Sequence, residues 1–205
     1  MKTIHILSLA AGTTLLLAGC SKAVDALEQK VTEAVSVQPA TGTVAYTIPA
    51  GAHYCSQNGI RAVELKEQAF TVRFDSSAVY RSSDPENQYD INKLWGFTDN
   101  GGTDPLQSSA RFGWRWSDGA LRLFGFVHNR GVFSEKELGT LALNTEAQCR
   151  IEVKPSWYVF TFNNHKDSLA RTATTPSGKG YQLFPYFGGD EAAPHQVTIW
   201  IREAP

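Results

Sequence analysis

Apolar and polar residues alternate along most of the chain from residue 44 onward. The period of two is clear in residues 62–66 (AVELK), 70–75 (FTVRFD) and 197–202 (VTIWIR). Such alternation predicts β-strands that bury one face, and clusters of Gly, Asn, Asp and Pro separate the runs at short intervals. We therefore expect an all-β fold, an antiparallel jelly-roll sandwich over residues 44–205.

A helical pattern occurs only near the N-terminus. In residues 21–36 the apolar positions Val24, Leu27, Val31 and Val35 recur at a spacing typical of a short amphipathic helix. Residues 36–43 (SVQPATGT) have the composition of a linker. We therefore expect residues 20–43 to form a tether ahead of the sandwich. The apolar stripe is too short to specify a coiled coil, so the oligomeric state stays open.

The chain begins with a short apolar run, residues 6–18, that ends in the sequence LAGC at 17–20. About a dozen residues are too few to span a bilayer comfortably. LAGC resembles the lipobox of bacterial lipoproteins, which implies removal of a signal peptide, residues 1–19, and lipidation of Cys20. Several acyl chains on one residue would anchor the protein stably to a membrane. Ser21 in place of Asp favours the outer membrane of the cell envelope; an ordinary secretory signal is the alternative.

Two further cysteines, Cys55 and Cys149, remain after lipidation of Cys20. Outside the cytoplasm a disulfide between them is the expected state. It would close a loop of 94 residues, for which chain-entropy models give a stabilisation of roughly 4–5 kcal/mol. Two separately buried thiols are the alternative.

Charge and metal-ligand spacing exclude several classes of partner. The chain has 19 Lys and Arg against 20 Asp and Glu, so no broad positive field favours nucleic acid. Neither Cys55 nor Cys149 has a second ligand at zinc spacing. We therefore expect no cofactor. The oxygen-rich turns at 99–104 and 189–191 are ordinary turn chemistry, with a structural calcium ion as the alternative.

The aromatic segment 110–129, ARFGWRWSDGALRLFGFVHN, predicts a β-hairpin with a Ser-Asp-Gly turn. Its alternation places one apolar face toward the core, made of Phe112, Trp114, Leu121, Leu123 and Val127. The opposite face would carry Arg111, Arg115, Arg122, Phe124, Phe126 and His128. Gly113 and Gly125 would leave room for a ligand to approach.

This mixed face suits a glycan, and an acidic one in particular. Aromatic rings stack on the apolar faces of sugars, and guanidinium groups bind hydroxyls or carboxylates in a bidentate manner. The alternative is that the aromatic and arginine pairs only stabilise the sheet. A register slip of one residue would also exchange the two faces.

A third aromatic strand, residues 156–165, carries Tyr158 and ends in His165. If it neighbours the hairpin, His128, Tyr158 and His165 gather at one end of the sheet. The two histidines and the tyrosine, beside the arginines, could then act in catalysis. We favour binding over catalysis, and whether the protein is an enzyme stays open.

Three segments together resemble a poorly characterised group of bacterial lipoproteins over about residues 60–203. They are NKLWGFTD (92–99), ARFGWRW (110–116) and KGYQLFPYFGGDEAAPH (179–195). The resemblance implies a concanavalin-like jelly roll, a fold shared by lectin domains, carbohydrate-binding modules and polysaccharide lyases, but no particular activity. The Glu-x-Asp-x-x-Glu strand of laminarinase-like hydrolases and the usual alginate-lyase motifs are absent. A glycan-binding lipoprotein is therefore the first interpretation, a lyase the second, and a structural envelope lipoprotein without a small ligand the third.

Overall fold

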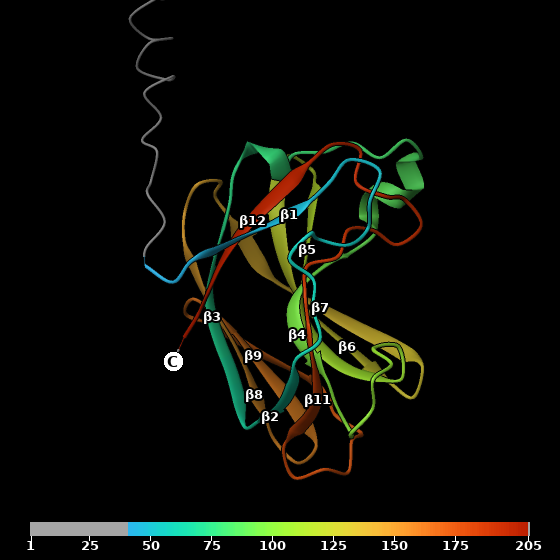
Figure 1. Ribbon diagram of the computed structural model, residues 1–205, viewed down its shortest axis with the longest axis vertical. Coiled ribbons are helices and arrows are strands. Elements are labelled where there is room, and N and C mark those ends of the chain that lie inside the picture. Colours follow the sequence, from blue (N-terminus) through green and yellow to red (C-terminus); the bar gives the residue numbers. More distant parts are fainter. Residues whose placement is uncertain (1–40, 205) are drawn as a thin grey trace, which may run out of the picture. The chain divides into compact units, whose positions relative to one another are not determined.

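The computed structural model describes residues 41–204, which form a sandwich of two six-stranded antiparallel sheets (Figure 1). The first sheet comprises, in spatial order, β1 (Val44–Ile48), β12 (Val197–Glu203), β3 (Glu67–Phe74), β8 (Ala147–Val153), β9 (Trp157–Phe162) and β10 (His165–Ala170). The second comprises β2 (Ala62–Leu65), β11 (Gly178–Leu183), β4 (Asn92–Thr98), β5 (Ser108–Ser117), β6 (Ala120–Asn129) and β7 (Val132–Leu141). Two short 3-10 helices, η1 (Ser76–Ala78) and η2 (Pro85–Tyr89), lie in the loops. The predicted all-β jelly-roll class is confirmed.

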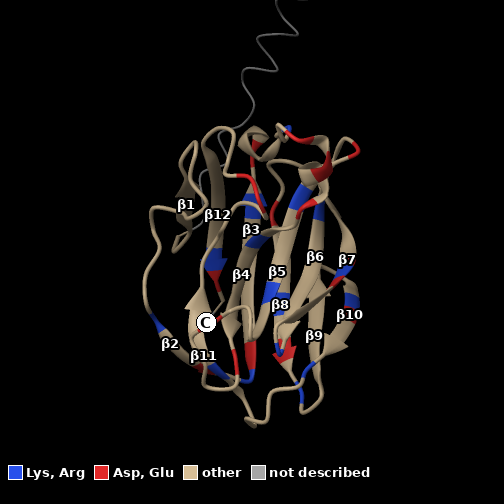
Figure 2. Cartoon of the chain, turned by 90° about the vertical axis from the view of Figure 1, so that its right-hand side faces the viewer, with Lys and Arg blue, Asp and Glu red and all other residues tan. Residues whose placement is uncertain are grey.

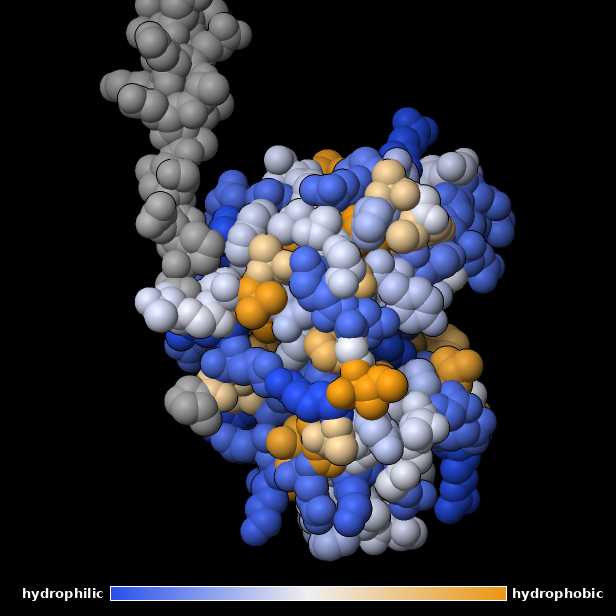
Figure 3. All heavy atoms as spheres, in the orientation of Figure 1, coloured by the Kyte–Doolittle hydropathy of each residue, from blue (hydrophilic) through white to orange (hydrophobic). Residues whose placement is uncertain are grey.

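The predictions for the N-terminal segment fall outside the described residues. They concern the signal peptide 1–19, the lipidated Cys20 and the helix within 21–36. Within residues 41–204, no helix has both the length and the apolar character needed to cross a membrane. On the face of the sandwich shown in Figure 3, apolar residues form scattered groups among hydrophilic ones, as is usual for a protein surface in water.

Aromatic side chains from both sheets fill the core. Phe112 on β5 meets Phe70 of the first sheet edge to face, with ring centroids 5.5 Å apart, and Phe160 in the same manner at 5.4 Å. Trp114 packs against Phe74 at 5.2 Å. Edge-to-face contacts of this kind fix the orientation of the rings and add stabilisation to that from burying apolar area. The predicted core face of the 110–129 hairpin is therefore confirmed, and Trp114 pairs with Leu123 in its register.

Gly113 and Gly125 of the hairpin leave room for the protein's own side chains and not for a ligand. A Cβ at Gly113 would lie 2.4 Å from Cγ2 of Ile91, and a Cβ at Gly125 would lie 2.9 Å from Cδ2 of Phe160. Both distances are too short for real contacts. The prediction that these positions leave space for a bound molecule is wrong.

The predicted disulfide is also corrected, because Cys55 and Cys149 are both buried free thiols. Cys55 lies beside β1, where the amide of the next residue, Ser56, donates to the Thr47 carbonyl at 2.8 Å. Cys149 belongs to β8, the third strand from β1 in the sheet. Three strand spacings amount to about 14 Å, whereas a disulfide needs Cα atoms within about 7 Å.

Candidate functional site

A groove of about 970 Å³ lies on the outer face of the second sheet. Its floor comes from β4, β5 and β11, and its walls come from residues 54–60, 103–106 and 184–190. Figure 2 turns strands β4–β7 toward the viewer and shows bands of Lys and Arg on β5 and β6. The groove is therefore a concave surface whose lining includes the basic residues Lys93 and Arg111.

Arg111 of β5 lines this groove, and its side chain has no partner among residues 41–204. The residue is 7% exposed, yet within residues 41–204 its guanidinium forms neither a hydrogen bond nor an ion pair, and its Nε is fully buried. Burial lowers the pKa of Arg111 to about 10. Buried cations in proteins are nearly always paired, because an unpaired charge in a poorly hydrated site is costly. The guanidinium is therefore available to a group from outside.

Lys93 of β4 adds a second cation to the groove. Its Nζ donates to the Ile91 carbonyl at 2.6 Å and lies 4.7 Å from the centroid of the Phe126 ring. Burial first, and then the charge of Arg111, lowers the pKa of Lys93 to about 8, while Asp90 and Glu135 act weakly in the opposite direction. Among the described carboxylates none forms an ion pair with this amine or with the guanidinium.

Two tyrosines add to the polar lining, which also includes the carboxylates of Asp104 and Asp190 in the walls. The Tyr54 and Tyr186 rings meet edge to face at 4.9 Å, and Tyr186 stacks on His53 at 5.2 Å. Burial and the neighbouring Tyr54 raise the pKa of Tyr186, and Arg111 lowers it. Ile60 and Leu106, both largely exposed, add apolar surface to the walls. The groove thus combines a cationic floor with walls that carry aromatic, aliphatic and acidic residues.

The predicted ligand face of the hairpin divides into two halves. In the tip half, Arg115 donates to the Tyr89 carbonyl at 2.8 Å and covers the Phe124 ring at 4.7 Å. Arg122 forms an ion pair with Glu137 at 2.8 Å. Both arginines are therefore used within the protein, and Phe124 is buried beneath them.

The base half consists of Arg111, Phe126 and His128, which share one face across the paired strands. Phe126 stacks parallel to the exposed Phe133 of β7 at 5.6 Å, and His128 packs against both rings. Burial, with the charges of Arg111 and Lys93, lowers the pKa of His128 to about 4. His128 is therefore neutral at neutral pH and is covered by aromatic rings, while Arg111 alone of the three lines the groove.

The proposed grouping of His128, Tyr158 and His165 is not found. Tyr158 belongs to β9 of the other sheet, is fully buried, and its hydroxyl donates to Asp99 Oδ2 at 2.5 Å. Arg171 pairs with the same oxygen at 2.8 Å. His165 is exposed on the edge strand β10. The reason is topological: β9 pairs with β8 and β10, and the hairpin belongs to the second sheet.

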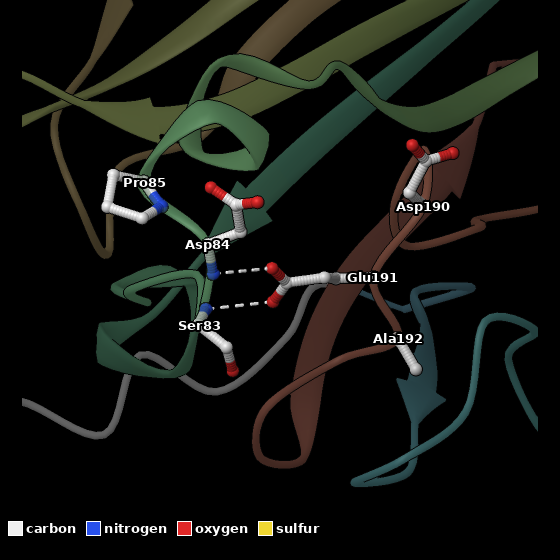
Figure 4. Close-up of a pocket in the computed structure, with 6 residues that line it drawn as sticks. All are labelled: Ser83, Asp84, Pro85, Asp190, Glu191 and Ala192. Atoms are coloured by element: carbon white, nitrogen blue, oxygen red, sulfur yellow. Dashed lines mark hydrogen bonds between the residues drawn. The ribbon is translucent and has the colours of Figure 1, made fainter.

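Asp99 and Glu191, one carboxylate from each oxygen-rich turn, form hydrogen bonds within the protein. Asp99 accepts hydrogen bonds from Tyr158 and Arg171 as described, and burial is outweighed by these donors, so its pKa is lowered. Glu191 accepts from the backbone amides of Ser83 at 2.8 Å and Asp84 at 2.7 Å (Figure 4). In the described part of the chain, no three His, Cys, Asp or Glu residues gather as metal ligands.

Sequence reasoning missed Lys93, Tyr54 and Tyr186 as members of the site. Lys93 and Tyr186 pair through a backbone bridge between segments almost a hundred residues apart. Both lie in the segments that carry the family resemblance, NKLWGFTD and KGYQLFPYFGGDEAAPH, but no chemistry distinguished them there. Their place in the site becomes visible only once the fold brings them into one groove with Arg111.

Comparisons with known proteins identify the fold. No family model and no curated protein sequence matches the chain. Among solved structures, the alginate lyase AlyC3 matches with a TM-score of 0.56 at 10% identity, over 79% of this chain and 74% of that one. A glycoside hydrolase family 16 protein of Bacteroides ovatus matches with 0.51 at 9% identity, over 82% and 83%. The Bacillus licheniformis β-glucanase matches with 0.50 at 12% identity, over 80% and 79%.

These likenesses show that residues 41–204 adopt the concanavalin-like jelly roll of such glycan enzymes. At such low identity they speak for the fold, and function must be argued from the site. The resemblance to a group of bacterial lipoproteins stays a prediction.

Proposed function

We propose that this domain binds an acidic glycan in the groove, with a uronate carboxylate held by Arg111. The observation that carries the proposal is the buried guanidinium of Arg111, which has no partner among the described residues and lines the groove. A carboxylate matches the planar fork of a guanidinium and can accept two parallel hydrogen bonds. Binding would supply the missing counter-charge.

The walls of the groove favour a sugar as the carrier of that carboxylate. Tyr54 is 62% exposed and, with Tyr186, presents aromatic surface next to the cations. Pyranose rings have apolar faces that stack on such rings, while their hydroxyls reach the tyrosine hydroxyls and Lys93. The alginate lyase of the same fold was solved with dimannuronate, so a jelly roll of this kind can hold a uronate.

The test is calorimetric titration of the full-length protein with oligomannuronates and oligogalacturonates, beside a neutral β-glucan oligomer. We expect binding of at least one uronate series, at least tenfold weaker binding after Arg111→Ala, and no binding of the neutral oligomer. Arg150→Ala is the matched control, because Arg150 is a half-exposed arginine on β8 of the other sheet. Uronate binding that survives Arg111→Ala unchanged would overturn the proposal.

A β-eliminating lyase is the second candidate, favoured by the placement of Tyr186 beside Arg111 in the groove. In that reaction a base removes the C5 proton of the uronate, the C4–O bond breaks, and the leaving oxygen takes up a proton. Arg111 would neutralise the carboxylate, and Tyr186, as its phenolate, would take the C5 proton and then donate it to the leaving oxygen. Ultraviolet absorbance of the conjugated product, lost after Tyr186→Phe, would identify a lyase; binding without absorbance identifies a binder.

The lipid anchor at Cys20 belongs to the same proposal, because it would hold the groove at the cell envelope, with the outer membrane as the favoured location. Mass spectrometry of the mature N-terminus tests it. We expect a triacylated Cys20 as the first residue, and Cys20→Ser should abolish both the lipidation and membrane recovery. An unmodified mature N-terminus elsewhere would show an ordinary secretory signal instead.

A further inference from the structure

Residues 188–190 form one edge of the groove, and they pack against a segment that covers the tip half of the hairpin. This wall segment, residues 81–91, contains η2 and lies over the tip half of the hairpin. Its Ile91 forms a small apolar cluster with Phe124 and Phe126, separate from the main core. The missing side chain of Gly113 makes room for Ile91. Strand β5 is therefore shaped to receive the wall segment.

Hydrogen bonds from outside the wall segment, and one within it, hold the wall segment in place. Glu191 accepts from two backbone amides of the segment, as Figure 4 shows, and from Asn87 Nδ2 at 3.0 Å. Gln88 Nε2 donates to the Trp116 carbonyl at 2.6 Å. Asp84 caps η2 through the amide of Glu86 at 3.0 Å. Hydrogen bonds at both ends and the apolar cluster make this a fixed part of the fold.

The wall segment and the groove meet at one place. Gly188, Gly189 and Asp190 line the groove, and Glu191, which follows directly, fastens the wall. A Cβ at Gly189 would fall on the Asp90 carboxylate, and the Asp190 amide donates to Asp90 Oδ2 at 3.3 Å. The backbone of the groove thus packs tightly against the end of the wall segment. A chain lying over Arg111 meets this contact on the side of the hairpin tip.

We propose that the groove receives the end of an acidic glycan chain, and that a long chain cannot pass through it. The inference rests on the proposed function and adds which part of the polymer is recognised. An open jelly-roll face would let a polymer cross all of its strands, whereas here the wall segment covers Phe124 and engages Arg115. Only the sugars nearest the chain end then contact Arg111 and Lys93.

The experiment counts protein molecules bound per polyuronate chain. The full-length protein is mixed with oligomannuronates of increasing defined length and with the polymer, and the stoichiometry is measured by sedimentation velocity. We expect affinity per chain to level off after the first few sugars. The number of proteins per chain should stay constant as the chain lengthens.

Arg111→Ala distinguishes the two ways in which the inference can fail. If the wild type binds in numbers proportional to chain length and Arg111→Ala abolishes this binding, the groove binds acidic glycan in mid-chain and the chain-end inference is wrong. If no uronate binding depends on Arg111, the proposed function fails, and the chain-end inference fails with it. A constant stoichiometry that depends on Arg111 supports both.

Discussion

Two arginines of this domain, Arg171 and Arg111, are buried to nearly the same extent but have opposite surroundings. Arg171 is 5% exposed and Arg111 is 7% exposed. Arg171 pairs with Asp99 at 2.8 Å and also donates to the carbonyls of Thr175 at 2.7 Å and Ser177 at 3.1 Å. Arg111 has none of these contacts within the described residues. Within residues 41–204 the guanidinium of Arg171 is satisfied and that of Arg111 is not.

The difference separates a structural arginine from a binding one. Removing a guanidinium from water costs several kcal/mol unless hydrogen bonds and a counter-charge replace the water. Folding supplies both at Arg171, so its presence needs no further explanation. At Arg111 the cost stays unmatched in the free protein, and Lys93 beside it increases the cost. A site that lowers stability in this way is typical of function.

The largest expected effect comes from breaking the satisfied pair. Arg171→Met leaves the buried Asp99 carboxylate without its counter-charge, and we expect a loss of about 3–5 kcal/mol in the free energy of unfolding. Urea unfolding measures it. The protein that remains folded should bind uronate normally, because Asp99 is not part of the groove. A loss below about 1 kcal/mol would mean that the two arginines do not differ as argued.

Arg111→Met should leave the protein stable and weaken uronate binding, the opposite of what we expect for Arg171→Met. The substitution keeps the length and apolar stem of the side chain and removes an unpaired charge, so we expect unfolding free energy to rise by about 1 kcal/mol. Uronate affinity should fall about tenfold to a hundredfold, since hydrogen bonds to charged groups contribute about 1.5–3 kcal/mol.

Arg111→Lys is the matched control for this pair of measurements. It keeps the charge but loses the two-pronged geometry, so its affinity should lie between that of the wild type and that of Arg111→Met. A destabilisation of Arg111→Met as large as that of Arg171→Met would show that Arg111 has a structural partner, which would remove the contrast.

The alternation of residues predicted the fold and both faces of the hairpin correctly. Phe112 and Trp114 are fully buried in the core, and Arg111, Phe126 and His128 share the other face. These properties are local, because the period of two fixes which side chains share a face once the strand exists. They required no knowledge of distant segments.

Long-range contacts decided what the sequence could not show. The wall segment packs on the hairpin through Ile91, and its Tyr89 carbonyl accepts a hydrogen bond from Arg115. The alternation pattern alone does not distinguish Arg115 from Arg111. Tyr158 was misplaced because strand order is not encoded in the strand itself. The cysteine pairing failed for the same reason, since strand order sets the distance between Cys55 and Cys149. Pairing of segments far apart in sequence governs all three.

Acid should lower the stability of the folded protein through His128. Its pKa is lowered from 6.5 to about 4 in the folded protein, so the unfolded chain takes up the proton first. Above pH 6.5 His128 is neutral in both states and the free energy of unfolding is not reduced. As the pH falls from 6.5 toward 4, the free energy of unfolding decreases by on the order of 2 kcal/mol. Urea unfolding across this range measures the slope. His128→Phe should flatten it, whereas an unchanged slope would assign it to other groups.

The smallest expected effect concerns Lys93 and separates binding from stability. Burial and Arg111 lower its pKa from 10.5 to about 8 in the free protein. Raising the pH above 8 removes one of the two groove cations, so uronate affinity should fall by about threefold, while Arg111, with a pKa of about 10, stays largely charged.

The free energy of unfolding should rise, not fall, as the pH increases above 8. The unfolded chain keeps the Lys93 proton up to pH 10.5 and the folded protein releases it near 8, so this group's contribution to stability rises between these values. Weaker binding together with undiminished stability would identify loss of a binding charge and not partial unfolding. Lys93→Met should bind at pH 7 as the wild type does above pH 8, and should lose the pH dependence. If Lys93→Met keeps the pH dependence of binding, a different group titrates there and Arg111 is the only binding cation.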